Sequence, residues 1–152
     1  MSFQLRAPVK LRRSRSMPGY SGTPLAGKLE LKPPLVLAAI GAPAEYRSWL
    51  GTLPAGVRIV SKPGKPLQAA HLFVTKRAAL EKGLQNLRKL LDQSGFVWVS
   101  WPKKAAKMDT DVTEDTVREV ALPLGFVDIK VCAVSEVWSG LKLVVRRSER
   151  TA

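Results

Sequence analysis

The chain has 152 residues, 45% of them apolar, which is enough for one folded domain with a substantial core. Lys and Arg outnumber Asp and Glu by 25 to 12, giving a formal net charge of +13 that favours an anionic partner. No stretch approaches the roughly eighteen apolar residues that span a bilayer. The lone Cys132 excludes an internal disulfide and predicts a cytoplasmic location.

The first sixteen residues carry five of the basic side chains and no acid. We expect residues 1–16 to form a disordered tail, because they are basic and poor in apolar residues. The tail has no apolar run of signal-peptide length, and its composition leaves open a transit peptide or a nucleic-acid-binding arm. We interpret Met17 as a candidate native start. The expected organisation is then a single α/β domain over residues 17–147 and a short C-terminal tail over 148–152.

The first half of the domain alternates between apolar runs and turn residues. A helical turn is expected around Leu25 and Leu29, which share a face at a spacing of four. The uninterrupted apolar run over residues 35–40 is typical of a strand covered on both faces. The pattern then predicts, in order, a short helix over 44–50, a strand over 57–60, a loop over 61–66 and a strand over 70–74.

The second half begins with the clearest helical pattern. Leu80, Leu84, Leu87 and Leu91 repeat at spacings of four, three and four, and Gly95 is expected to cap the helix that they define. A strand over 96–101 and a helix over 114–122 are predicted next, with Asp111 or Thr113 as the cap of the helix. A strand over 126–134 follows, in which Val127, Ile129, Val131 and Ala133 share one side. The last strand is expected over 141–146, after a bend at Ser139 and Gly140.

Strands that alternate with helices predict a parallel α/β sheet. The connection between the last two strands is too short for a crossover, so these two strands are expected to pair antiparallel. The predicted fold is a three-layer, Rossmann-like α/β domain with a mostly parallel sheet and an antiparallel last strand.

This ending resembles the methyltransferase-type Rossmann-like fold. The leucine-striped helix, the stretch from Ser94 to Ser100, and the stretch from Gly140 to Arg146 carry the resemblance. On that mapping, the strand and helix that would follow Val60 are missing or reduced to the loop over 61–66.

Four further stretches resemble a small bacterial family that is described only as a domain of unknown function. They are Gly19–Leu25 (GYSGTPL), His71–Thr75 (HLFVT), Trp98–Lys104 (WVSWPKK) and Val137–Leu143 (VWSGLKL). The resemblance covers roughly residues 17–147, leaves the tail outside, and implies no activity, substrate or catalytic residue.

The turn after the first strand lacks a cofactor motif. A dinucleotide or S-adenosylmethionine site uses glycines at this turn, whereas here Gly41 is followed by Ala42 and by Pro43, which has no amide proton. The second strand runs into Ser61 and has no acidic residue for ribose hydroxyls. We therefore predict no cofactor, and the sequence favours a non-enzymatic role.

No catalytic or metal-binding constellation stands out. His71 has no carboxylate within reach in the sequence, and a polar residue at a strand start explains it more simply. Cys132 lies in an alternating strand, as small core residues do, and Ser100 lacks the glycines of a nucleophile elbow. No group of His and Cys residues has the spacing of a metal site.

The basic loop after the fourth strand is the best candidate site, because ligands of open parallel sheets bind beyond the carboxyl ends of the strands. We expect an anion-binding rim made of Gly41, Lys76, Trp101, Lys103, Lys104, Lys107 and Thr110, in which Trp101 offers a stacking surface. The simpler alternative is that the tryptophans belong to the core and the lysines are solvated.

Three functional hypotheses follow. The first is non-catalytic binding of an anionic ligand or partner at the carboxyl ends of the strands. The second is a divergent S-adenosylmethionine-type transferase that uses the same edge. The third is a nucleic-acid-binding protein that uses its basic surface and tail.

Overall fold

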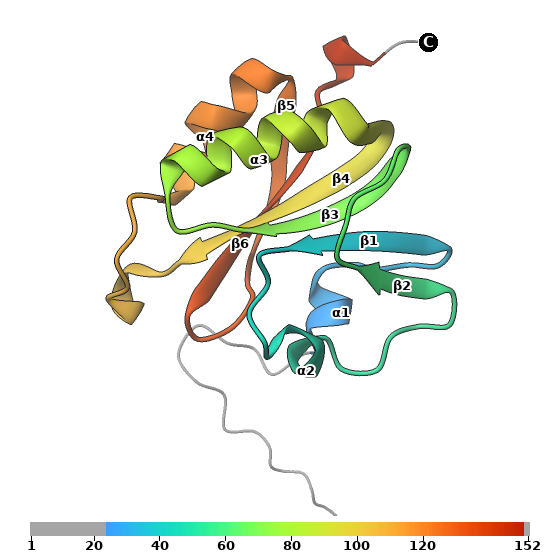
Figure 1. The fold of residues 1–152 in the computed structure, drawn as a ribbon, viewed down its shortest axis with the longest axis horizontal. Coiled ribbons are helices and arrows are strands. Elements are labelled where there is room, and N and C mark those ends of the chain that lie inside the picture. The colour runs from blue at the N-terminus through green and yellow to red at the C-terminus, as the bar shows by residue number, and fades with distance from the viewer. Residues whose placement is uncertain (1–23, 151–152) are drawn as a thin grey trace, which may run out of the picture.

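Six strands form one mixed sheet in the order β2-β1-β3-β4-β6-β5 (Figure 1). The computed structural model describes residues 24–150. The predicted tail over residues 1–16 and the candidate start at Met17 lie outside the described residues. The strands are β1 (Leu35–Ile40), β2 (Val57–Val60), β3 (Leu67–Phe73), β4 (Leu91–Pro102), β5 (Phe126–Ala133) and β6 (Trp138–Val145).

Helices and short helical turns connect these strands. They are α1 (Leu25–Lys28), α2 (Tyr46–Leu50), α3 (Arg77–Leu90), α4 (Glu114–Ala121), and the 3-10 turns η1 (Lys104–Ala106), η2 (Leu122–Leu124) and η3 (Arg147–Glu149). Of the two predicted caps for α4, Thr113 is the one used: its side chain accepts a hydrogen bond from the Thr116 amide, and the Thr116 side chain accepts one from the Thr113 amide.

The predicted strand directions are confirmed. β1 pairs in parallel with β2 and β3, and β3 pairs in parallel with β4. β6 lies antiparallel between β4 and β5, as the short connection after β5 requires. The carboxyl ends of β1, β2, β3 and β4 therefore meet at one edge of the sheet.

Helices cover both faces of the sheet (Figure 1). On one face, the leucine stripe of α3 is fully buried at Leu80, Leu84 and Leu87, and Val117 of α4 joins the same core. Each such leucine stabilises the fold by roughly 1.5–3 kcal/mol relative to exposure. On the other face, α1 and α2 cover Trp98, whose Nε1 donates to the Leu29 carbonyl at 3.1 Å.

The prediction that Gly95 caps α3 is wrong. The helix ends at Leu90 and β4 begins at once at Leu91, with a register shift relative to β3 before Phe96. Gly95 lies in this irregular part of the strand, where a Cβ atom would stand 2.6 Å from the Gln68 carbonyl oxygen. The glycine therefore permits close approach of two backbones and ends no helix.

The expected bend at Ser139 and Gly140 is also absent, because β6 is continuous from Trp138 to Val145. In β5, a register shift between Asp128 and Lys130 interrupts the predicted alternation, and Ile129 and Val131 are more than half exposed. A bulge in an edge strand re-aims the side chains that follow it.

Residues 61–66 join β2 directly to β3, so the strand and helix missing from the sequence pattern are also absent here, and β2 is an edge of the sheet. Within residues 24–150, none of the helices combines the length and the apolar character that crossing a bilayer demands.

Gly95→Ala should lower the free energy of unfolding by about 1–3 kcal/mol, the usual cost of overpacking. Gly64→Ala is the matched control, because no atom lies within 4 Å of its added Cβ. Urea denaturation measures both. Equal stability of the two variants would contradict the close approach at Gly95.

Candidate functional site

A cavity of about 440 Å³ opens where β1 and β2 end. We call it the β1–β2 cavity. Its walls are Ala39, Ile40, Gly41, Ala42, Pro43, Ala44, Tyr46, Arg47, Ile59, Val60 and Ser61. Most of these side chains are apolar. Arg47 supplies the only charged side chain on the wall, and no carboxylate lines the cavity among the residues that the structure describes.

Gly41 shapes the turn at the floor of this cavity. Its φ is +71°, and a Cβ atom there would stand 2.9 Å from the carbonyl oxygen of Phe73 at the end of β3. Both the left-handed backbone and the close approach require glycine. The one glycine that remains in this turn therefore brings the loop after β1 against β3.

A chain of three buried polar side chains supports the cavity from behind. The Tyr46 hydroxyl lies 2.8 Å from His71 Nδ1, and His71 Nε2 lies 2.7 Å from Ser100 Oγ. The chain links α2, β3 and β4. Phe73 stacks on the imidazole at a centroid distance of 4.3 Å, which encloses it further.

This chain is structural and not a catalytic dyad. The Ser100–His71 distance suits a nucleophile and its base, but both side chains are 0% exposed, so no substrate reaches them. Burial lowers the pKa of His71 to about 3 and raises the pKa of Tyr46. His71 thus stays neutral and satisfies two hydroxyl groups inside the core. It lies within β3 and not at its start, where the sequence pattern had placed it.

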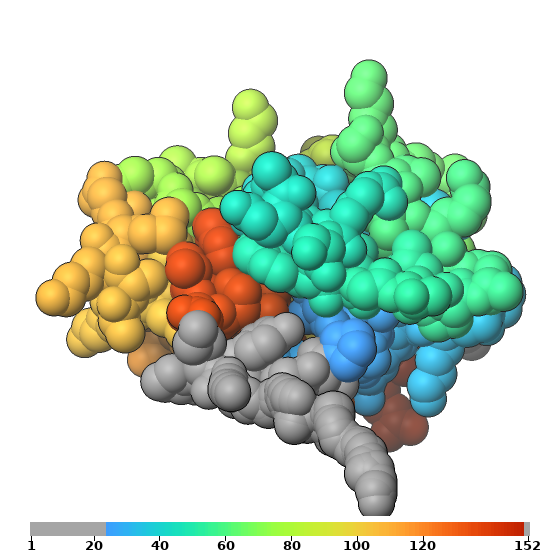
Figure 2. All heavy atoms as spheres, turned by 90° about the horizontal axis from the view of Figure 1, so that it is seen from below, coloured from blue at the N-terminus to red at the C-terminus, as the bar shows by residue number. Residues whose placement is uncertain are grey.

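The loop between the β5 and β6 strands lies beside α2 on the same face of the molecule (Figure 2). A second hollow of about 450 Å³ lies between these segments, and Pro43 belongs to both hollows. Trp49 and Trp138 contribute aromatic surface to its wall, beside Glu45 and Glu136. Cys132, in the adjoining strand, has its pKa raised by burial, which makes its thiol less reactive.

The structure separates the predicted anion-binding rim into parts. Trp101, Lys104 and Thr110 line one hollow of about 420 Å³, whereas Gly41 belongs to the β1–β2 cavity. Trp101 is only 6% exposed, so most of the indole is core rather than stacking surface. Lys107 is exposed next to η1, with a positive φ of 55°.

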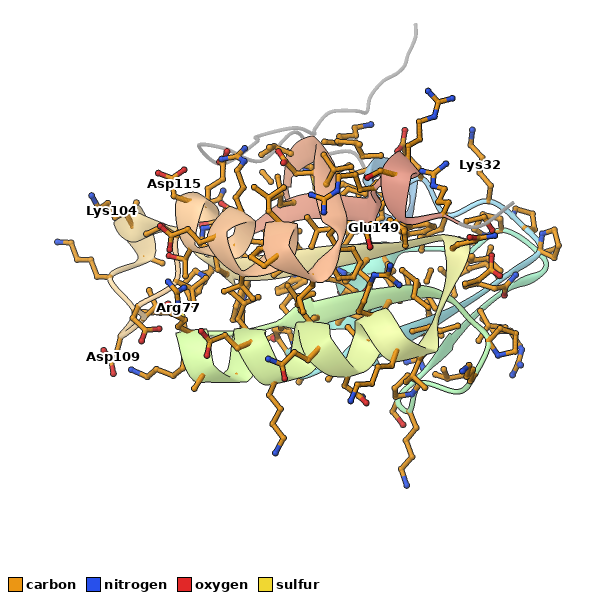
Figure 3. All side chains as sticks on the ribbon, turned by 90° about the horizontal axis from the view of Figure 1, so that it is seen from above. Lys32, Arg77, Lys104, Asp109, Asp115 and Glu149 are labelled. Atoms are coloured by element: carbon orange, nitrogen blue, oxygen red, sulfur yellow. The ribbon has the colours of Figure 1, made fainter. Side chains whose placement is uncertain are left out.

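Acidic residues that the rim hypothesis did not include lie among these lysines. Lys76 Nζ pairs with Asp109 at 2.9 Å, which raises the pKa of the lysine, and Asp111 lines the hollow with Lys104. Figure 3 shows Lys104, Asp109 and Arg77 at the end of the molecule opposite Lys32. The Thr110 hydroxyl donates a hydrogen bond to the Thr75 carbonyl. Lys103 is half-buried, and its backbone amide donates to the Val137 carbonyl.

The N-terminus of α4 carries its own negative groups. Glu114 and Asp115 occupy its first turn, and both pair with Arg118. Carboxylates in a first turn already complement the helix dipole. The region around η1 and α4 is therefore of mixed charge, and it is less favourable for an anion than the count of lysines suggested.

Sequence reasoning missed Arg47 and Ser61. Their positions after strand ends could have marked them as site residues. Arg47 lies in the helix after β1, and Ser61 directly follows β2. Arg47 was overlooked because Tyr46, Trp49 and Leu50 defined the helix by their apolar face. Its guanidinium Nη2 donates to the Ile59 carbonyl at 3.4 Å, which holds it over β2.

No protein-family model matches this sequence, and no curated protein is similar to it. The resemblance of its four motifs to a domain of unknown function therefore stays a prediction. Solved structures are similar in fold at low identity.

An O-methyltransferase from neocarzinostatin biosynthesis, solved with S-adenosylmethionine and 2-hydroxy-5-methyl naphthoic acid, has a TM-score of 0.61 at 14% identity over 82% of this chain. The match covers 53% of that enzyme. A S-adenosylmethionine-dependent methyltransferase from Aquifex aeolicus has a TM-score of 0.55 at 12% identity, covering 79% of this chain and 89% of the other.

The ribosomal protein L11 methylase of Lactobacillus delbrueckii subsp. bulgaricus has a TM-score of 0.50 at 12% identity, covering 81% of this chain and 76% of the other. The predicted fold is confirmed by these neighbours and by the strand order: the chain has a methyltransferase-like α/β fold.

His71 is the only histidine, so its imidazole resonances need no assignment in an NMR titration. We expect them to stay unchanged from pH 8 to pH 5, because the folded pKa is about 3. The unfolded chain takes up this proton near pH 6.5, so the free energy of unfolding should fall as the pH drops from about 6.5 towards 3. An imidazole that titrates near pH 6.5 in the folded protein would rule out the buried hydrogen bonds between Tyr46, His71 and Ser100.

Proposed function

We propose that this protein binds an anionic small molecule, of the class of phosphorylated nucleosides, in the β1–β2 cavity. The observation that carries the proposal is Arg47, a guanidinium on the wall of a cavity that lacks carboxylates among the described residues. Ligands of open α/β sheets bind at this edge, beyond the carboxyl ends of the strands. The proposal keeps the expected ligand class and moves the site from the lysine-rich loop to the ends of β1 and β2.

The shape and chemistry of the walls support a ligand with a flat apolar part and a charged group. Ile40, Ile59 and Val60 provide apolar surface. Only one hydrogen bond occupies the Arg47 guanidinium among the described contacts, whereas a guanidinium has five N–H donors. The remaining donors match the geometry of a phosphate.

S-adenosylmethionine, which the neocarzinostatin O-methyltransferase structure contains, fits these residues poorly. Sites in this class of fold use an acidic residue at the end of the second strand for ribose hydroxyls, and here Val60 is followed by Ser61. Pro43 removes a backbone donor from the turn. A guanidinium would also repel the sulfonium cation. We therefore rank the divergent transferase second and derive no methyl-transfer step.

Thermal unfolding with added ligands tests the proposal. AMP and ATP should raise the melting temperature, since a ligand at a hundredfold excess over its Kd stabilises the native state by about 2.7 kcal/mol. Adenosine, which lacks phosphate, should give a smaller shift. Stabilisation by S-adenosylmethionine or S-adenosylhomocysteine alone would favour the transferase instead.

Arg47→Ala should weaken AMP binding roughly tenfold to a hundredfold, because hydrogen bonds to charged groups contribute about 1.5–3 kcal/mol. Arg147→Ala is the matched control, an exposed arginine of η3 outside the cavity. Isothermal titration calorimetry measures both. If the two variants bind AMP equally, Arg47 is not part of the site.

A further inference from the structure

Between Glu45 and Glu81 the sequence contains no acidic residue. The same interval contains six basic residues: Arg47, Arg58, Lys62, Lys65, Lys76 and Arg77. It spans α2, β2, β3 and the start of α3. A basic run of this length has no local counter-charge, so its neutralisation depends on what the fold brings near it.

The fold supplies acids to the last two of these residues. Lys76 pairs with Asp109 at 2.9 Å, and Arg77 pairs with Glu119 of α4 at 2.8 Å and with Glu81 at 3.1 Å. These two cations are therefore neutralised within the protein, even though the run that contains them is acid-free.

The other four have no ion pair among the described residues, and one of them, Arg47, lies on the wall of the β1–β2 cavity. Among residues 24–150, the ion pairs all involve the region from α3 onward or Glu30, and none reaches Arg58, Lys62 or Lys65. All three residues are exposed. We call them the β2-edge cations. Other exposed cations, among them Lys82 and Lys89 of α3, also have no ion pair among the described residues, but the β2-edge cations lie in the acid-free interval of the sequence.

A short connection that contains two prolines links these cations from β2 to β3. Arg58 lies on the edge strand β2, and the chain then passes β1 on its way to β3 (Figure 1). Lys62 precedes Pro63 and Lys65 precedes Pro66, and a residue before proline is restricted to extended conformations. Lys62 and Lys65 are therefore at most about 10 Å apart along the chain. Less conformational entropy is lost when such a pre-ordered segment binds.

We propose that the β2-edge cations bind the phosphate backbone of a single-stranded nucleic acid. Charge complementarity favours a polyanion, because three exposed cations without an ion pair follow one another within residues 58–65. The three cations lie on the edge strand β2 and on the connection that follows it, and neither segment is a helix that could enter a duplex groove. Proteins that bind single strands without sequence preference use such positively charged tracks.

An anionic membrane is the alternative polyanion, and the apolar surface argues against it. Peripheral membrane binding combines cations with inserted apolar side chains. The large exposed apolar residues among those described are Met108, Leu122, Ile129 and Val131, and all of them lie outside β2 and residues 61–66. The β2-edge cations have no such partner for lipid. This inference does not depend on whether the β1–β2 cavity binds a ligand.

Fluorescence anisotropy with a labelled twelve-nucleotide oligouridylate and oligothymidylate, between 50 and 200 mM salt, tests the proposal on the full chain. Lys62→Ala/Lys65→Ala should weaken binding at least fivefold at the lower salt. It should also reduce the slope of log affinity against log salt by about 1.4, the value for two lost contacts to a single strand. Adding Arg58→Ala should extend both effects.

The control pair is Lys82→Ala/Lys89→Ala on α3, which removes the same charge from two exposed lysines elsewhere. We expect it to change the affinity less than twofold. Equal losses of affinity in the two double variants would show that binding follows net charge alone and would overturn the proposal. Unchanged affinity in both double variants would also overturn it. Binding to phosphatidylserine vesicles that depends on Lys62 and Lys65, without oligonucleotide binding, would assign the edge to lipid instead.

Discussion

The imidazole of His71, enclosed between two hydroxyl groups, is the contact on which the candidate site depends. It joins Tyr46 of α2 to Ser100 of β4 through the middle of β3. A buried polar group costs free energy unless it is hydrogen-bonded, so each of the three side chains requires the others. Tyr46 also lines the β1–β2 cavity, and the chain of hydrogen bonds therefore fixes the helix that carries Arg47.

Charge is distributed according to which elements the fold brings together. Around α3 and α4, acids from several elements meet the basic side chains, and Arg118 alone contacts Asp115, Glu114 and Asp128. At the β2 edge no acid arrives, because the sheet ends there and residues 61–66 return directly to β3. Among the described residues, the region around α3 and α4 therefore has mixed charge, whereas Arg58, Lys62 and Lys65 have no acidic partner.

The sequence pattern predicted the mostly parallel sheet, the α3 leucine stripe and the antiparallel β6, because these depend on local periodicity and on connection length. It failed at Gly95 and Gly140, because a glycine in a sequence pattern usually indicates the end of a helix or a bend in a strand. Both glycines lie inside strands and make room for neighbours: the Gln68 carbonyl in one case, the Val134 side chain in the other. The contact of Gly95 with Gln68 joins residues far apart in the chain, as does the contact of Gly140 with Trp98, and no local pattern encodes either.

By itself, the sequence determined the class of the fold, the missing glycine motif after β1, and the excess of basic residues. These are properties of single segments and of composition. Only the tertiary structure decided which cations are paired with acids. It brought Asp109 to Lys76, left Lys62 and Lys65 exposed without an ion pair, and placed Arg47 on the wall of a cavity. An ion pair depends on distance in space, and the packing of α3, α4 and the strand ends sets that distance.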